Sequence, residues 1–214
     1  MNGFKVFAVL TLLLLSACTA VSNVPTDYQL SSSSGNGLLL ASVTYKGRYS
    51  EHSMMFREVG SSKWNKLKIG AQHALLLPSM LDWDIESPGL RGNVFAVELP
   101  AGEYEFASWY VGSGVASTGP VNPFSIRFDI SPGDATYTGN FHFIKESSVA
   151  VLFATFNVGL ENEFDRDIAL IKQKYGSLDI AQVYSNVAEA ESLSRIGGGG
   201  ATQVTIPMPV PMGY

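Results

Sequence analysis

The sequence of 214 residues has little charge and a single cysteine. Asp, Glu, Lys and Arg make up 15% of the residues, whereas about 25% is typical of soluble domains. Nineteen acidic residues against 14 basic ones give a net charge of −5, which argues against nucleic-acid binding because that function needs a basic face. The one cysteine, Cys18, excludes a disulfide within the chain.

The spacings typical of metal sites and of common catalytic sites are also missing. His52, His73 and His142 stand in no HxH, HxxxH or HExxH pattern, so the sequence predicts no zinc site. It contains no GxSxG nucleophile elbow, no P-loop and no GxGxxG motif after a strand. We therefore expect no catalytic residues, no metal and no cofactor. A hydrolase site assembled from distant residues, such as Glu103 or Asp134 with His142, is a disfavoured alternative.

Residues 1–17 have the pattern of a secretory signal peptide. Lys5 is followed by Val6 to Leu15, where only Thr11 is polar. This run is too short to cross a bilayer core of about 30 Å as a helix, but it suits a signal peptide. It ends in Leu15-Ser16-Ala17-Cys18, which resembles the lipobox of bacterial lipoproteins. An ordinary signal peptide with an incidental cysteine is the alternative.

The lipoprotein resemblance implies a membrane anchor and a location. Cleavage before Cys18 would leave 214 − 17 = 197 residues, with the thiol lipidated and the new N-terminus acylated by chains such as palmitate. Because Thr19 rather than Asp follows Cys18, the resemblance implies the periplasmic side of the outer membrane. A lipidated thiol is also unable to act as a nucleophile, a zinc ligand or a redox centre.

The composition predicts flexible segments at both ends of the mature chain. Residues 18–36 contain the lipidated cysteine and then Pro25 and the run Ser31 to Ser34, which are typical of a tether spanning roughly 25 Å. Residues 197–214 begin with four glycines and continue with prolines alternating with apolar residues. They predict a disordered tail, with an extended peptide that docks in a partner's groove as the alternative.

Residues 37–158 predict a mainly β domain, an antiparallel β-sandwich. Eight or nine short apolar runs are separated by glycine and proline turns, which is typical of that architecture. Two hairpins stand out, one turning at Pro100 to Gly102 and the other at Ser131 to Asp134. Strict alternation would place two sets of side chains each on one face: Tyr104, Phe106, Ser108 and Tyr110, and then Tyr137, Gly139, Phe141 and Phe143.

The two hairpins resemble those of a group of uncharacterised bacterial lipoproteins with a transthyretin-like, or prealbumin-like, β-sandwich. The resemblance lies between Asn93 and Phe143, in a Leu-Pro-x-Gly-x-Tyr hairpin and in a Pro-Gly turn that leads to Tyr-x-Gly. The residues that carry it are Leu99, Pro100, Gly102 and Tyr104, followed by Pro132, Gly133, Tyr137 and Gly139. It implies a fold and no catalytic residues.

Residues 159–196 predict two C-terminal helices packed on the sandwich. The first extends from Glu161 to Tyr175, with a stripe of apolar residues at helical spacing and acidic residues in its first turn. The second extends from Asp179 to about Leu193, and Asp179 is its expected N-cap. The alternative is a helix pair that docks a partner.

One acidic loop contains the candidate ligand contacts. Asp82, Trp83 and Asp84 lie in the segment LDWDIES, where a large ring between two acids suggests a contact surface for a glycan. Their spacing also resembles the start of a calcium loop, but Ser87 and Asn93 replace the glycine and glutamate that an EF-hand needs. A solvated loop is the simplest interpretation.

The sequence as a whole predicts a non-enzymatic, lipid-anchored protein of the cell envelope. Its sandwich would present a surface to a protein partner in the periplasm. The alternatives are a module that binds carbohydrate or peptidoglycan through Trp83, and the hydrolase mentioned above.

Overall fold

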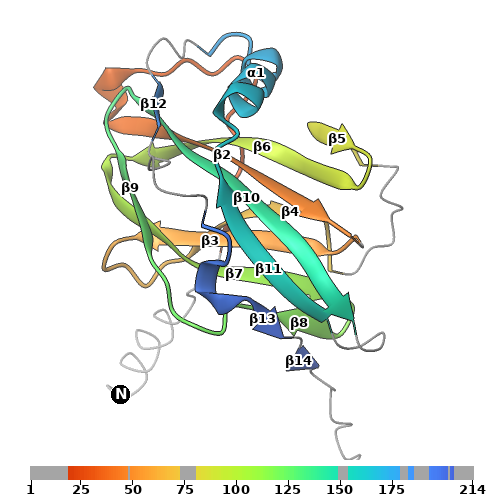
Figure 1. Cartoon of the computed structure of the whole chain (residues 1–214). Coiled ribbons are helices and arrows are strands. Elements are labelled where there is room, and N and C mark those ends of the chain that lie inside the picture. Colours follow the sequence, from red (N-terminus) through yellow and green to blue (C-terminus); the bar gives the residue numbers. More distant parts are fainter. Residues whose placement is uncertain are drawn as a thin grey trace, which may run out of the picture.

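The protein is mainly β, with two facing sheets and one α-helix over the described part of the chain (Figure 1). A computed structural model describes residues 19–47, 49–72, 81–148, 154–178, 183–185, 193–201 and 203–204. Strands account for 54% of the structure, so the expected mainly β fold is confirmed. The signal peptide and Cys18 lie outside the described residues, as does the tail from residue 205.

The first sheet, sheet A, has seven strands. Their order is β1 (Thr19–Ala20), β4 (Asn65–Ile69), β3 (Glu51–Glu58), β7 (Gly102–Ser113), β8 (Ala116–Thr118) and β14 (Gln203–Val204), and β9 (Ile126–Ile130) pairs with the other half of β7. All these pairs are antiparallel except β1 with β4, which is parallel.

The second sheet, sheet B, also has seven strands. Their order is β13 (Gly200–Ala201), β11 (Ala154–Glu161), β10 (Ala135–Ser148), β2 (Asn36–Lys46), β6 (Leu90–Pro100) and β5 (Ile85–Ser87), and β12 (Val183–Ser185) pairs with the start of β10. The β10–β2 and β10–β12 pairs are parallel, whereas the other pairs are antiparallel. The expected all-antiparallel sandwich is therefore wrong at these two pairs and at β1–β4.

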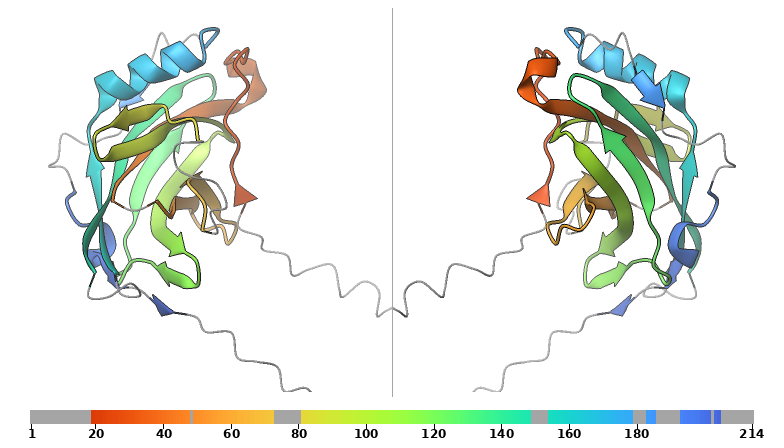
Figure 2. Two further views of the ribbon diagram at one scale, coloured as in Figure 1. Left: turned by 90° about the vertical axis from the view of Figure 1, so that its right-hand side faces the viewer. Right: turned by 90° about the vertical axis from the view of Figure 1, so that its left-hand side faces the viewer.

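Two apolar cores make the molecule three layers thick (Figure 2). Strand β2 alternates, so that Leu39 and Val43 enter the core between the sheets while Leu38 and Leu40 face outward. Helix α1 (Phe164–Lys174) covers the outward side with Ile168 and Ile171. The first predicted helix is thus confirmed, although it begins at Phe164, because Glu161 belongs to β11. Its apolar stripe explains why it packs on sheet B.

The predicted alternation in β7 and β10 is wrong because each strand contains a β-bulge. In β10 the register shifts between Tyr137 and Asn140, and Gly139 adopts a φ of 101° that favours glycine. Tyr137 consequently packs beneath α1, whereas Phe141 and Phe143 pack between the sheets. In β7 the extra residue is Ala107, which turns Trp109 inward with Tyr104 and Phe106 and places Ser108 and Tyr110 on the opposite face.

The second predicted helix, from Asp179 to about Leu193, is not confirmed. Val183–Ser185 form β12 in place of helix, and they pair with β10 from Ala135 to Tyr137. Leu193 forms an isolated bridge with Leu160. Residues 179–182 and 186–192 lie outside the described part of the chain. At these three residues, backbone pairing with β10 replaces the helical packing that the sequence pattern predicted.

The segment predicted to be a flexible tether packs against the sandwich. Residues 19–24, which we call the N-terminal strap, run from the edge of sheet A to the edge of sheet B. Thr19 and Ala20 pair with β4, Val24 N donates to Ala96 O at 2.9 Å, and Val24 is only 8% exposed. Ser32–Ser34 form a 3-10 turn, η1, before β2. The part of the predicted tether from Thr19 to Val24 is thus paired with both sheets.

The glycine run predicted to begin a disordered tail is also part of the fold. Residues 193–201 and 203–204, the C-terminal strap, include the 3-10 turn η3 (Ile196–Gly198) and then pair with β11 and β8. Trp109 Nε1 donates to Ile196 O at 3.1 Å. A Cβ on Gly200 would lie 2.5 Å from the Trp109 ring and would overlap Gly119 O, so close packing requires glycine here.

Candidate functional site

A polar cluster lies on the outer face of sheet B, beside helix α1. Its members come from β2, β10 and the first turns of α1: Ser42, Thr44, Tyr137, Asn140, His142, Arg166 and Asp167. Parallel pairing of β2 with β10 sets Ser42 opposite Asn140 and Thr44 opposite His142. The outer face of β2 therefore changes from apolar at Leu38 and Leu40 to polar at Ser42 and Thr44.

Asp167 is the centre of one half of this cluster. Its side chain is fully buried, and Oδ2 lies 2.6 Å from Ser42 Oγ and 2.7 Å from the Tyr137 hydroxyl. Arg166 Nη2 approaches Oδ1 at 2.8 Å. Burial and the charge of Asp167 raise the pKa of the Tyr137 hydroxyl, which therefore stays protonated and donates to the carboxylate. The buried charge is thus compensated by three donors.

Asn140 connects this half of the cluster to His142. Asn140 Oδ1 lies 2.9 Å from Ser42 Oγ and 3.0 Å from Thr44 Oγ1, and its Nδ2 donates to Glu161 Oε2 at 3.1 Å. Thr44 Oγ1 and His142 Nδ1 are 2.8 Å apart. When Thr44 donates its single proton to Asn140, His142 Nδ1 must carry the hydrogen of the second bond. Burial lowers the pKa of His142, which favours this neutral imidazole.

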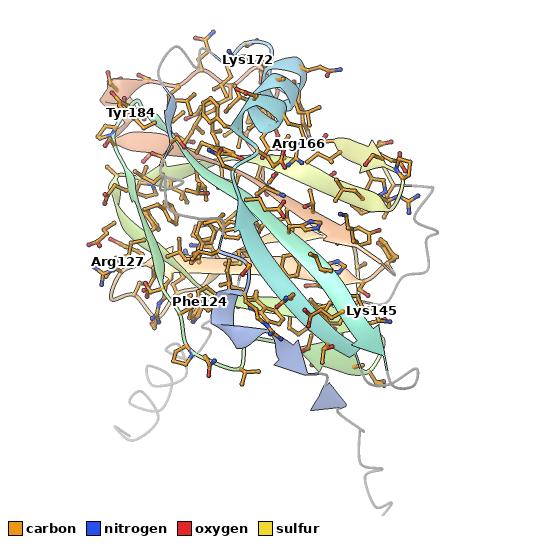
Figure 3. All side chains as sticks on the ribbon, viewed as in Figure 1. Phe124, Arg127, Lys145, Arg166, Lys172 and Tyr184 are labelled. Carbon is orange, nitrogen blue, oxygen red and sulfur yellow. The ribbon has the colours of Figure 1, made fainter. Side chains whose placement is uncertain are left out.

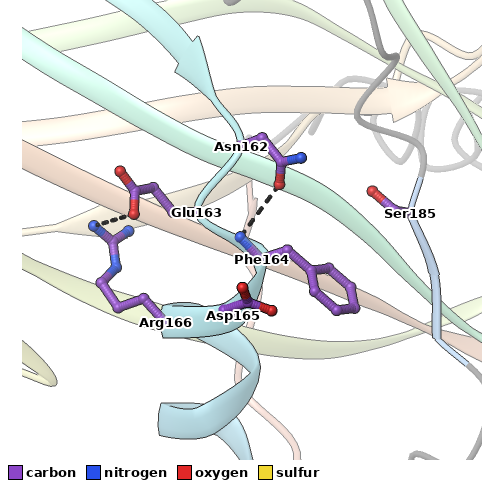
Figure 4. Close-up of a pocket in the computed structure, with 6 residues that line it drawn as sticks. All are labelled: Asn162, Glu163, Phe164, Asp165, Arg166 and Ser185. Carbon is purple, nitrogen blue, oxygen red and sulfur yellow. Dashed lines mark hydrogen bonds and ion pairs between the residues drawn. The ribbon is translucent and has the colours of Figure 1, made fainter.

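A shallow hollow adjoins the cluster at the beginning of α1 (Figure 4). It has a volume of about 460 Å³, and it is lined by Asn162, Glu163, Phe164, Asp165, Arg166 and Ser185. Arg166 contacts Glu163 at 3.5 Å as well as Asp167, so its charge is already balanced from two sides. Phe164 N donates to Asn162 Oδ1 at 3.2 Å. The hollow offers one aromatic ring, two neutral polar side chains and the exposed carboxylate of Asp165.

The hydrogen-bond order in the cluster differs from that of a hydrolytic triad. In a triad the hydroxyl donates to an imidazole, and the carboxylate orients that imidazole from the other side. Here the Ser42 hydroxyl contacts the Asp167 carboxylate directly, and the His142 Nδ1 contacts Thr44. Ser42 and Thr44 are also fully buried. The arrangement fixes α1 on sheet B and leaves neither hydroxyl open to a substrate.

The structure separates the residues of the expected glycan contact. Trp83 packs on the core between the sheets, with ring centroids 5.8 Å from Tyr45 and 6.4 Å from Tyr49. Asp84 Oδ2 accepts from Lys174 Nζ at 2.6 Å and from Val94 N at 3.1 Å, so its carboxylate links α1 to β6. Asp82 is exposed. Trp83 and Asp84 are thus engaged within the fold, and of the three side chains only Asp82 is fully exposed.

The other sequence-based candidates are equally dispersed. Glu103 belongs to sheet A, where its carboxylate forms an ion pair with Arg127 at 2.8 Å, whereas His142 lies on the outer face of sheet B beside Thr44. Within the described ranges, no three His, Cys, Asp or Glu side chains are grouped so that they could hold a metal ion. Leu15, Ser16, Ala17 and Cys18 lie outside the described residues.

Sequence reasoning missed the polar cluster entirely. Its members come from three regions of the chain, and only the parallel β2–β10 pairing and the docking of α1 unite them. One signal was present: Ser42 and Thr44 alternate with Ala41 and Val43 inside an otherwise apolar run. Such an alternation indicates that one face of the strand meets polar partners.

No family model, no curated protein and no solved structure matches this chain. Its function must therefore be inferred from its own residues. Over the residues that the structure describes, no helix is long and apolar enough to cross a membrane.

Proposed function

We propose that this chain is a lipid-anchored, non-enzymatic protein of the bacterial cell envelope whose β-sandwich binds a protein partner. One observation carries the proposal. Cys18, which ends the lipobox-like sequence, directly precedes Thr19, and Thr19 begins β1. Cleavage and acylation at Cys18 would thus attach the lipid at the boundary of the folded domain, with no part of the sandwich removed.

The hydrogen bonds of the polar cluster support a structural role for its aspartate, serine and tyrosine side chains. Asp167, Ser42 and Tyr137 bond to one another inside the fold, at 2.6 Å and 2.7 Å. Buried networks of this kind stabilise a unique packing when every member is satisfied. The cluster therefore favours a scaffold that holds α1 in place, in line with a non-enzymatic protein.

The finer parts of the proposal are the outer membrane, the periplasmic side and the transthyretin-like architecture. They are supported by Thr19 after Cys18, and by the Leu99 and Pro132 hairpins, which both lie in the sandwich. The hairpin resemblance names turn and core residues, so it bears on the fold and leaves the partner open.

The surface beside the C-terminal strap contains two exposed apolar side chains that a partner could contact. Val115 is 54% exposed and Val121 is 68% exposed, and both are large apolar side chains. Val121 N donates to Gly197 O and Gly199 O, which fixes it next to the strap. Val115 precedes β8, which pairs with β14. Both side chains thus lie next to the strap, where a partner could cover them.

Metabolic labelling with an alkyne fatty acid tests the anchor. We expect label on the wild-type chain and none on Cys18→Ser, with Ser16→Thr as a matched control that keeps the cysteine. Mass spectrometry should place the mature N-terminus at Cys18. Absence of label from the wild type, or a mature chain that begins at another residue, would refute the proposed anchor.

Crosslinking in intact cells tests the partner. The exposed turn Ser87 to Gly89 accepts an affinity tag without disturbing either strap. We expect one envelope protein to copurify in near-stoichiometric amount, and its recovery to fall when Val115 and Val121 are both changed to serine. Recovery of the tagged chain alone would remove the partner from the proposal and leave the anchor in place.

A further inference from the structure

The edge of sheet A formed by β1 and β4 is basic in a chain that is acidic overall. Residues 59–81 contain Lys63, Lys66 and Lys68 and no aspartate or glutamate, although the whole chain has a net charge of −5. All three lysines belong to β4 or lie within two residues of it. Three positive side chains, with no acid between them in the sequence, therefore lie along one strand at one edge of the sandwich.

The side chains of this edge are directed outward. Leu67 and Ile69 enter the core, so alternation places Trp64, Lys66 and Lys68 on the outer face of sheet A. Lys63 and Lys68 are exposed, and neither forms an ion pair with any described residue. Lys66 contacts Glu51 at 3.3 Å. The half-buried Trp64 ring adds an amphipathic side chain at the same edge.

The N-terminal strap begins at this edge, at the residue that follows Cys18. Thr19 and Ala20 pair with Asn65 and Lys66, and Val21 N donates to Lys66 O at 3.3 Å. Cys18 is bonded directly to Thr19, so a lipid on Cys18 would be attached one residue from a strand that pairs with β4. A lipid on Cys18 would therefore hold β4 against the membrane surface.

We infer that the β1–β4 edge binds anionic phospholipid headgroups beside the anchor. This inference rests on the proposed lipidation of Cys18. Lys63 and Lys68 attract the headgroup phosphates, and Trp64 lies at the level of the headgroups, where amphipathic rings are favoured. The acidic remainder of the chain is repelled by the same surface. The sandwich is thus held in one orientation instead of rotating about a flexible tether.

Lysine acetylation of the full-length lipidated protein in vesicles tests this orientation. One set of vesicles contains phosphatidylglycerol, and the other contains phosphatidylcholine alone. Lys172, exposed on helix α1 and distant from β4, is the internal reference (Figure 3). We expect Lys63 and Lys68 to react at least about threefold more slowly in the anionic vesicles, relative to Lys172. High salt should remove that protection.

Two matched double variants test whether the charges of the edge lysines bring Trp64 close to the lipid. Quenching of Trp64 by brominated phosphatidylglycerol, measured against Trp64→Phe, should fall in Lys63→Gln/Lys68→Gln. It should stay unchanged in Lys145→Gln/Lys172→Gln, which removes two lysines from β10 and α1 (Figure 3).

The outcomes that contradict this inference differ from those that contradict the anchor. If the protein fails to float with the vesicles, the proposed lipidation fails. If it floats but Lys63 and Lys68 react as fast as Lys172, or are protected equally without phosphatidylglycerol, the headgroup contact is overturned and the anchor stands.

Discussion

Changing Asp167 to alanine should destabilise the protein much more than changing an exposed residue of helix α1. The substitution leaves the Tyr137 and Ser42 hydroxyls without their carboxylate, which lies 2.7 Å and 2.6 Å away. An unsatisfied buried donor costs about 1–3 kcal/mol, and breaking a buried charged pair about 3–5 kcal/mol. Because the Arg166 side chain is 28% exposed, its charge can turn toward water. The two hydroxyls left without an acceptor then account for the expected loss, which is about 3–5 kcal/mol.

Urea and thermal denaturation of the full chain, followed by circular dichroism, measure this loss. A change of 1 kcal/mol shifts Tm by about 2–4 °C in a domain of this size, so the expected fall is roughly 6–20 °C. Asp165→Ala is the matched control, because Asp165 is an exposed acid in the same turn of α1. Asp167→Asn should fall between the two. If Asp167→Ala costs no more than Asp165→Ala, the polar cluster does not stabilise α1.

Two further predictions concern close packing and burial. Gly200→Ala should cost about 1–3 kcal/mol in urea denaturation because its Cβ would press on the Trp109 ring, whereas Gly176→Ala, with open space around its Cβ, should cost less than about 0.5 kcal/mol; equal costs would show that the C-terminal strap is loosely held. His52 is 1% exposed, and burial lowers its pKa to about 3. As the pH falls from about 6.5 toward 3, the unfolded chain therefore binds a proton at His52 that the folded chain does not bind. Stability should fall over that range, and His52→Phe should make the slope shallower by up to about 1.4 kcal/mol per pH unit; an unchanged slope would contradict the buried neutral imidazole.

The fold class and helix α1 were predictable because local periodicity determines both. Strands with one buried face alternate apolar and polar residues, and a helix on a sheet repeats its apolar residues every three or four positions. Ile168 and Ile171 show the helical case, since both lie on α1 and pack against sheet B as the stripe predicted. Nothing distant in the chain was needed for these two inferences.

The assignment of faces failed where one extra residue interrupts the alternation. The bulges at Ala107 and Gly139 each reverse which side chains enter the core. A one-residue shift has that effect on every following position, so a local error propagates to the end of the strand. The glycine within β10 was a usable signal, because glycine inside a strand often marks a bulge. Ala107 carried no comparable signal.

The polar cluster was beyond the reach of local patterns for a different reason. Ser42 and Asp167 are separated by 125 positions, and their contact depends on how α1 docks. The parallel pairing of β2 with β10 is equally non-local, because a parallel pair needs a long connection. The alternation of Ser42 and Thr44 could have indicated a polar face, but the sequence offered no means of naming the partners.

The two straps show why composition misjudged both ends of the domain. Serine and glycine supply little apolar surface, so a segment rich in them is interpreted as a linker. An open sheet edge needs backbone N–H and C=O groups rather than apolar side chains, and every residue except proline supplies both. The N-terminal strap pairs with β4 and Ala96, and the C-terminal strap pairs with β11 and β8, on opposite sides of the sandwich (Figure 2). An anchor at Cys18 would consequently transmit any force from the membrane to the backbone hydrogen bonds that pair β1 with β4.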